Sequence, residues 1–338
     1  MDADIALILL QDGVVNGAIY ALLALSLVLV FAVTRVILIP QGELVAFGGL
    51  TYAALDAGRP PGSLWLLGGL GAAAFVAGLL QGRRGVLRLA AETLVIPALV
   101  IGLTLLLAPR QPGVALEALL SVAIVAPMAP YLYRIAFQPL ASASVLVLLI
   151  ASVGVHLALN GLGLIFFGPE GYRAQGFSDA RYVIGDLVVP GQAVWILGLT
   201  VVAMGGLALF FDRTLAGKAL RATAVNRLGA RLVGIGTSLS GRIAFTLAGL
   251  IGAASGVLIV PLTTIYYDTG FLVGLKGFVA AIIGGLTSYP LAAAAAILVG
   301  CVESFSSFYA SAFKEVVVFT VIIPVLLWRS LRGAVEEE

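Results

Sequence analysis

Long apolar stretches separated by short polar segments make up most of this 338-residue chain. A helix needs about 20 apolar residues to cross the roughly 30 Å hydrocarbon core of a bilayer. The apolar stretches therefore predict membrane-spanning helices near residues 5–34, 36–56, 64–80, 92–108, 115–134, 145–167, 191–211, 243–262, 272–287, 290–310 and 314–329. The stretches 64–80 and 272–287 are short and rich in glycine, which is compatible with tilted, broken or re-entrant segments. The expected fold is an all-α polytopic integral membrane protein, a bundle of roughly eight to eleven transmembrane helices in one domain, residues 1–338.

The composition agrees with a bilayer as the solvent. Apolar residues make up 61% of the chain and charged residues 11%, and the mean hydropathy is +1.12, against about 45–50% apolar and 25% charged in soluble domains. The single cysteine, Cys301, excludes an intrachain disulfide. The only histidine, His156, has no second ligand at metal-binding spacing, so a hydrogen-bonded packing role is expected and no metal site. Nucleic acid is not an implied partner. The acidic amino terminus lacks the basic region of a secretory signal and is expected to be retained.

Cations gather in alternate loops between the predicted spans. They are Arg35, the group Arg83, Arg84 and Arg88, then Arg134, the segment 213–242, and Arg329 with Arg332. Because cytoplasmic loops of membrane proteins are enriched in Lys and Arg, this pattern predicts an amino terminus outside and a carboxyl terminus in the cytoplasm. The longest intervening loop, 168–190, carries mixed charges and is expected on the exterior side.

The most basic stretch lies between Asp212 and Arg242. It holds six of the 19 cations and no acid after Asp212. Apolar residues recur in it at every third or fourth position, which predicts one face of one or two short amphipathic helices; they are Leu220, Ala224, Leu228, Leu232 and Ile235. Such a segment suits either a topological anchor on anionic lipid headgroups or a docking helix for a cytoplasmic partner, and composition does not separate the two.

The motif GKALRATAVNRLGARLVGI at 217–235 resembles the cytoplasmic loop of membrane subunits of the branched-chain amino-acid ABC transporter family, in particular the smaller of its two permease subunits. Further blocks of the same resemblance lie at 16–37, 41–50, 245–258 and 274–300. The resemblance implies that residues 213–240 form a cytoplasmic coupling loop that docks on an ATPase subunit. The positions that match the docking pattern are Lys218, Arg221, Ala222, Thr223, Ala224, Asn226, Arg227, Ala230, Arg231 and Gly234.

The same resemblance implies the partners and the location. These are a second related permease subunit, two cytoplasmic ATPase subunits, an external substrate-binding protein and membrane lipid, in the bacterial inner membrane. The chain lacks a G-x-x-x-x-G-K-[ST] loop, so we expect no enzyme activity and no cofactor on it, with ATP and Mg on the partners. The implied cargo is branched-chain or other apolar amino acids, or related amides and small acids.

The sequence also departs from the family's pattern. Gln41, Gly42 and Glu43 replace its usual His-Gly-Asp or His-Gly-Glu, and the run from Thr287 to Leu291 replaces Gly-Ser-x-Pro-Gly. Residues 60–125 are longer than the family's usual connection and predict extra apolar segments.

Polar and ionisable groups within apolar spans are energetically costly, so they are expected to face protein or water. The candidates for the translocation path are therefore Asn16, Gln41, Glu43, Lys276 and Glu303. An ion-coupled secondary transporter or channel, working without an ATPase, would use the same buried charges and is the alternative that the sequence leaves open.

Overall fold

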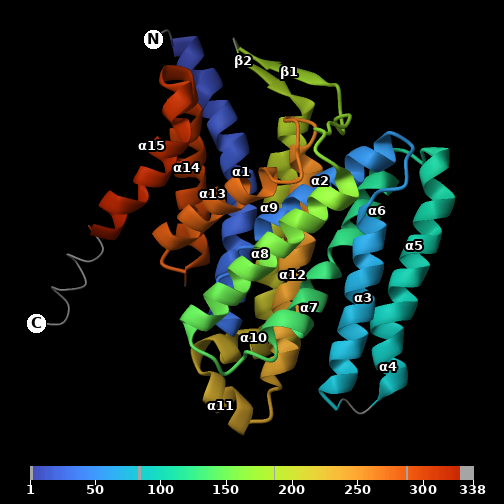
Figure 1. Ribbon diagram of the computed structural model, residues 1–338. Coiled ribbons are helices and arrows are strands. Elements are labelled where there is room, and N and C mark those ends of the chain that lie inside the picture. Colours follow the sequence, from blue (N-terminus) through green and yellow to red (C-terminus); the bar gives the residue numbers. More distant parts are fainter. Residues whose placement is uncertain (1–2, 83–84, 186, 287, 328–338) are drawn as a thin grey trace, which may run out of the picture.

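The computed structural model describes residues 3–82, 85–185, 187–286 and 288–327, which form a helical bundle with a two-stranded antiparallel hairpin (Figure 1). In chain order the elements are α1 (Ala3–Thr34), α2 (Gln41–Asp56), α3 (Ser63–Leu80), α4 (Val86–Ala90), the π-helical turn η1 (Ala91–Val95), α5 (Ile96–Leu107), the 3-10 turn η2 (Ala108–Arg110), α6 (Val114–Val125), α7 (Met128–Leu132), the π-helical turn η3 (Tyr133–Phe137), α8 (Val145–Phe167), β1 (Arg181–Ile184), β2 (Leu187–Pro190), α9 (Gly191–Arg213), α10 (Leu215–Val225), α11 (Arg227–Leu232), α12 (Thr237–Ile259), α13 (Thr269–Ile283), α14 (Tyr289–Tyr309), the 3-10 turn η4 (Ser311–Phe313) and α15 (Lys314–Thr320). Arg83, Arg84, Thr287, Arg329 and Arg332, which entered the predictions above, lie outside the described residues.

The prediction of an all-α polytopic membrane protein is confirmed. Within the described part of the chain, eight helical segments are long and apolar enough to cross a membrane; they are Asp4–Thr34, Ser63–Leu80, Val86–Arg110, Val114–Phe137, Val145–Phe167, Gly191–Arg213, Thr237–Ile259 and Tyr289–Tyr309. Two of them, Ser63–Leu80 and Val86–Arg110, lie in the stretch 60–125, for which extra apolar segments were predicted. We call α10 and α11 the elbow. The elbow and the hairpin lie at opposite ends of the bundle (Figure 1), which we name the elbow end and the hairpin end.

Three predicted spans are shorter than expected. The predicted span 314–329 begins as α15, but this helix ends at Thr320. The prediction of a helix over 36–56 is wrong for its first part, because the chain after Arg35 (φ 63°) is non-helical and α2 begins only at Gln41. Pro40 favours this, since a proline disfavours helical geometry in the residue before it. The stretch 272–287 forms α13, whose 15 residues rise only about 22 Å. The chain then reverses at Gly285 and Leu286, both with positive φ. This segment is therefore short, as its glycine-rich sequence allowed.

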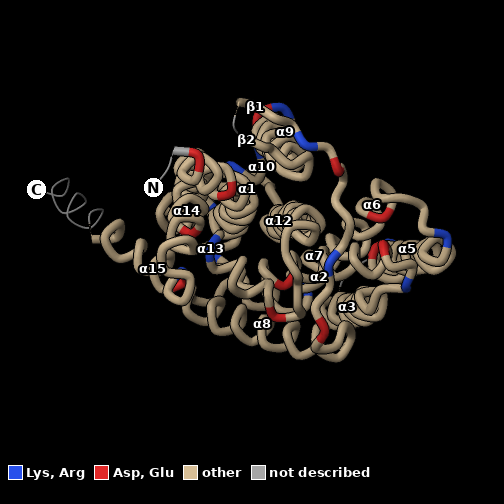
Figure 2. Tube along the Cα trace, turned by 90° about the horizontal axis from the view of Figure 1, so that it is seen from above, with Lys and Arg blue, Asp and Glu red and all other residues tan. Residues whose placement is uncertain are grey.

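The long helix α1 lies inside the bundle, where it contacts α12, α13 and α14 (Figure 2). Its contact with α14 is backbone to backbone: a Cβ atom placed on Gly300 would meet the backbones of Gly13 and Gly17. Glycine permits this approach because no side chain keeps the two helices apart. Figure 2 also shows that α8 runs along one edge of the bundle, beside α13, α2 and α3.

Substitution of Gly300 by leucine is expected to destabilise the bundle. Overpacking costs typically about 1–3 kcal/mol, and here the new side chain would meet backbone, which cannot rotate away. The matched control is Gly205→Leu on α9, where a Cβ meets nothing within 4 Å. Thermal unfolding of the purified protein in detergent should show a lowered midpoint for Gly300→Leu alone. Equal midpoints for the two variants would contradict the close helix contact.

Candidate functional site

Helix α2 begins in the middle of the bundle. The N–H of Ile39 donates to Ser152 Oγ (2.9 Å), and Gln41 Nε2 donates to the carbonyl of Ala248 (3.0 Å). Ser152 and Ala248 lie in the interior of α8 and α12, away from the ends of both helices. At its other end α2 reaches the hairpin end, where Asp56 Oδ2 accepts from the N–H of Gln175 (3.1 Å). Helix α2 therefore occupies only the half of the bundle nearer the hairpin.

Helix α13 occupies the other half. Its first turn lies against the start of α2, because a Cβ on Gly42 would collide with the backbone of Gly270. After its last turn the chain reaches Leu286, which lines a cavity together with Arg35 and Arg221 at the elbow end. The amino termini of two short helices thus meet in the middle of the bundle. In transporters, interrupted helices of this kind place backbone dipoles at substrate and ion sites near the bilayer centre.

A buried polar pair marks this junction. His156 Nδ1 lies 2.7 Å from Glu43 Oε1, and the imidazole ring stacks on Phe271 at 4.6 Å between centroids. The expectation that His156 is hydrogen-bonded is confirmed. Its partner could not be identified from the sequence, because 113 residues separate the two positions. The pair joins α2, α8 and α13 at the point where the two short helices begin.

An apolar cavity of about 460 Å³, which we call the central cavity, lies beside this pair. It lies between α1, the non-helical segment before α2, α8 and α13; its walls include Leu27, Ile39, Val153, Leu157, Phe271 and Phe278. Among the described residues that line it, His156 is the only ionisable one. The volume falls in the range of small-molecule sites, roughly 300–1,000 Å³, and such sites combine apolar walls with a few polar groups.

The five candidates for the translocation path fall into separate places. Glu43 and Gln41 lie at the α2–α13 junction, and both are fully buried. Lys276 and Glu303 instead contact one another, with 2.5 Å between Nζ and Oε1. Asn16 is half-buried in the first half of α1. Neither Asn16, Lys276 nor Glu303 lines the cavity beside His156.

The elbow consists of two short helices, as the spacing of its apolar residues allowed. Each begins with a side-chain cap: Thr214 Oγ1 accepts from the N–H of Gly217, and Asn226 Oδ1 accepts from the N–H of Gly229, both at 2.9 Å. Such caps satisfy backbone donors that a helix leaves free at its start. Gly234 follows the end of α11, and its φ of 85° suits glycine just after a helix.

The prediction of one continuous apolar face is wrong beyond Ala224. Asn226 takes an extended conformation, with φ −147° and ψ 100°, so α11 starts in a new direction. Leu220 is buried, but Leu228 and Leu232 are 68% and 81% exposed. The elbow therefore presents leucines to its surroundings instead of packing all of them against the bundle.

The residues that match the docking pattern divide by exposure. Thr223 and Ala230 are buried, and Ala224 and Arg227 are half-buried; the exposed ones are Lys218, Arg221, Ala222, Asn226, Arg231 and Gly234. Thr223 Oγ1 lies 3.2 Å from Ser240 Oγ in α12, and Arg227 Nη1 donates to the carbonyl of Ala141 (3.1 Å). We therefore assign the buried and half-buried residues to holding the elbow in place.

These features define a class of protein, a helical transport protein of the membrane with interrupted helices at its centre and an amphipathic elbow at one end. The chain belongs to the family described as branched-chain amino acid transport system / permease component, whose model matches residues 9–326. It is a transport component and not an enzyme.

Individual relatives agree with this family. The chain is 29% identical over 203 residues to the high-affinity branched-chain amino acid transport system permease protein BraD of Pseudomonas aeruginosa, covering 58% of this chain and 66% of that protein. It is 29% identical over 203 residues to the corresponding protein LivH of Escherichia coli K12, covering 57% and 65%. A probable branched-chain amino acid transport permease protein LivH of Methanocaldococcus jannaschii is 30% identical over 210 residues, covering 60% and 65%. The match thus spans slightly less than two thirds of the length of these relatives.

Proposed function

We propose that this chain is one permease subunit of an ABC importer that moves branched-chain or other apolar amino acids, or related amides and small acids, into the cytoplasm. In this proposal it pairs with a second related permease subunit and docks two ATPase subunits, which hold ATP and Mg. An external binding protein delivers the substrate. The chain lies in a bacterial inner membrane with its amino terminus outside and its carboxyl terminus in the cytoplasm. Family membership supports the permease role, and the elbow carries the proposal of ATP-driven transport.

The elbow has the surface that a docking helix needs. Leu228 and Leu232 of α11 are exposed at the elbow end, and each directly follows an arginine, Arg227 or Arg231. An exposed apolar patch rimmed by polar residues is typical of a protein interface. We infer that an ATPase subunit covers these leucines and that its acidic groups meet the arginines.

The elbow is also firmly joined to the bundle. Leu220 packs in one buried cluster with Leu29 and Val33 of α1, Phe211 of α9 and Ala244 of α12. Because packed elements move as units, a displacement of the elbow would be passed to these three helices. In our proposal this displacement opens the central cavity to alternate sides of the membrane.

The central cavity supports the choice of cargo. Its walls are apolar and suit a branched aliphatic side chain, whereas His156 and the amino termini of α2 and α13 offer polar groups for the zwitterionic end. The rival mechanism, ion coupling without an ATPase, would need buried charges at the cavity. Lys276 and Glu303 are instead engaged with one another outside it. Glu43 lies beside the cavity but is engaged with His156 and does not line it.

Reversal of the elbow charges tests the proposal. In the complex reconstituted with its ATPase and binding-protein partners, the double variant Arg221→Glu/Arg231→Glu should insert normally but lose substrate-stimulated ATP hydrolysis. Both side chains are exposed, so the fold should survive their change. The matched control is Arg59→Glu/Arg110→Glu, which makes the same change of charge on exposed residues at the hairpin end. Normal stimulation in the elbow variant, or uptake driven by an ion gradient with this chain alone, would overturn ATP-driven coupling through the elbow.

A further inference from the structure

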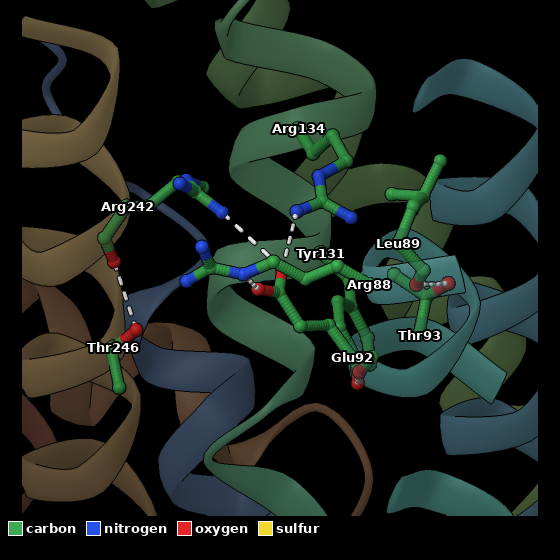
Figure 3. A network of polar contacts seen from close by, with 8 residues as sticks. All are labelled: Arg88, Leu89, Glu92, Thr93, Tyr131, Arg134, Arg242 and Thr246. Carbon is green, nitrogen blue, oxygen red and sulfur yellow. Dashed lines mark hydrogen bonds and ion pairs between the residues drawn. The ribbon is translucent and has the colours of Figure 1, made fainter. Parts of the chain in front are cut away.

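A second polar cluster, drawn in Figure 3, lies at the elbow end (Figure 1) and involves residues of neither the central cavity nor the elbow. Glu92, in the π-helical turn η1, is its centre. Its carboxylate meets Arg88 Nε at 3.0 Å, Arg134 Nη2 at 3.3 Å and Arg242 Nη1 at 3.4 Å. Tyr131 also donates its hydroxyl to the backbone carbonyl of Glu92, at 2.7 Å. The carboxylate of Glu92 thus contacts three guanidinium groups from three parts of the chain.

Arg134 is the most deeply buried member of the cluster. The residue is 3% exposed, and its Nε and Nη1 have no hydrogen-bond partner among the described residues. A guanidinium is always charged and offers five donors in a planar fork. Buried charged donors of this kind are normally satisfied. The arrangement therefore suits an additional acceptor, and phosphate oxygens match the fork well.

The arginines line one end of an apolar groove with a volume of about 470 Å³. Its walls come from η1, α5, α6, α7 and α12 and include Ile96, Val122, Ala123, Ile243 and Leu250. Among the described residues of the lining, Glu92 is the only acidic one. From Arg242 to Leu250 the wall formed by α12 rises roughly 12 Å, which is long enough for part of an acyl chain.

The groove opens sideways, onto the apolar flank of the bundle. Among its lining residues Ile96, Leu239 and Leu250 are 51%, 52% and 41% exposed. A soluble anion would not bind apolar walls that open toward hydrocarbon. An amphiphile would place its charged group at the arginines and its apolar chain along these walls. We propose that this groove binds an anionic phospholipid, with the headgroup phosphate at Arg134 and Arg242 and an acyl chain along α12 toward Leu250. This inference does not depend on the proposed transport function.

Native mass spectrometry of the full-length protein in detergent tests this site. The protein is incubated with phosphatidylglycerol, with phosphatidylcholine of the same acyl chains, or with inorganic phosphate. We expect phosphatidylglycerol to be retained in preference to phosphatidylcholine, and inorganic phosphate neither to bind nor to compete. Arg242→Gln should lower phosphatidylglycerol occupancy by about fivefold, the factor expected for the loss of one cation near an anionic headgroup.

A substitution in the apolar part of the groove tests the lipid site without changing the buried Arg134. Ala123→Trp fills the groove without altering charge and should also abolish preferential retention. The matched controls are Leu119→Trp, one turn earlier on α6 and outside the lining, and Arg110→Gln at the hairpin end; both should bind like the parent. Equal retention of the two lipids, binding of phosphate alone, or unchanged binding in Ala123→Trp would overturn the lipid site. A cross-link from position 123 to a second protein chain in native membranes would also overturn it, because that chain would occupy the groove.

Discussion

Replacement of Lys276 by methionine is expected to lower the free energy of unfolding by about 3–5 kcal/mol, the cost of removing one partner from a buried ion pair. Lys276 is 5% exposed, and its ammonium lies 2.5 Å from Glu303 Oε1 and 3.1 Å from Glu315 Oε1. Tyr20 donates its hydroxyl to the other oxygen of Glu303, at 2.5 Å. Without the lysine, the carboxylates of Glu303 and Glu315 would lose the cation that lies between them. Chemical unfolding of the purified protein in detergent measures the loss.

Two further variants separate this effect from a general loss of packing. The triple variant Lys276→Met/Glu303→Gln/Glu315→Gln removes all three charges and should recover most of the lost stability, because replacing a whole buried ionic group can be nearly neutral. Lys314→Met makes the same lysine change on a half-buried residue of α15 and should shift stability by less than about 0.5 kcal/mol. A triple variant as unstable as Lys276→Met would show that the ionic contacts are not the cause.

From the cluster around Lys276 we infer a structural role for Lys276 and Glu303, which the sequence offered as path candidates. The members of this cluster come from α1, α13, α14 and α15 and hold these four helices together. The sequence could identify Lys276 and Glu303 as buried charges, because charges in apolar spans are rare and conspicuous. It could not show that they are partners, since 27 residues and a chain reversal separate them.

Other features of the fold could not be predicted from the sequence either. Apolar length predicted the long helices, because crossing hydrocarbon imposes a minimum length on each of them. It could not predict that α2 begins in the middle of the bundle, because residues 36–39 are as apolar as the residues of a membrane-spanning helix. Only Pro40 indicates the interruption. The pairing of Glu43 with His156 and the central cavity follow from that interruption. At the elbow, periodicity predicted the helices but not the change of direction at Asn226, where a side-chain cap competes with helix continuation.

Filling the central cavity is expected to abolish substrate uptake while leaving the bundle intact. Val153 lies on α8, is 39% exposed and lines the cavity beside His156. A tryptophan at this position would occupy the space that we assign to the apolar side chain of the substrate. We expect uptake by the reconstituted complex to fall by about tenfold or more, which corresponds to at least about 1.4 kcal/mol of lost substrate stabilisation. ATP hydrolysis without substrate should persist, because the elbow is unchanged.

Ile150→Trp is the matched control for this variant. Ile150 lies on the same helix one turn earlier, is 63% exposed and does not line the cavity. Its tryptophan would project to the outside of α8, so uptake should stay near the parent value. If both variants lose uptake equally, α8 acts through an interface with another subunit and not through the cavity. If Val153→Trp transports normally, the substrate passes elsewhere, because a blocked cavity of about 460 Å³ could not carry it.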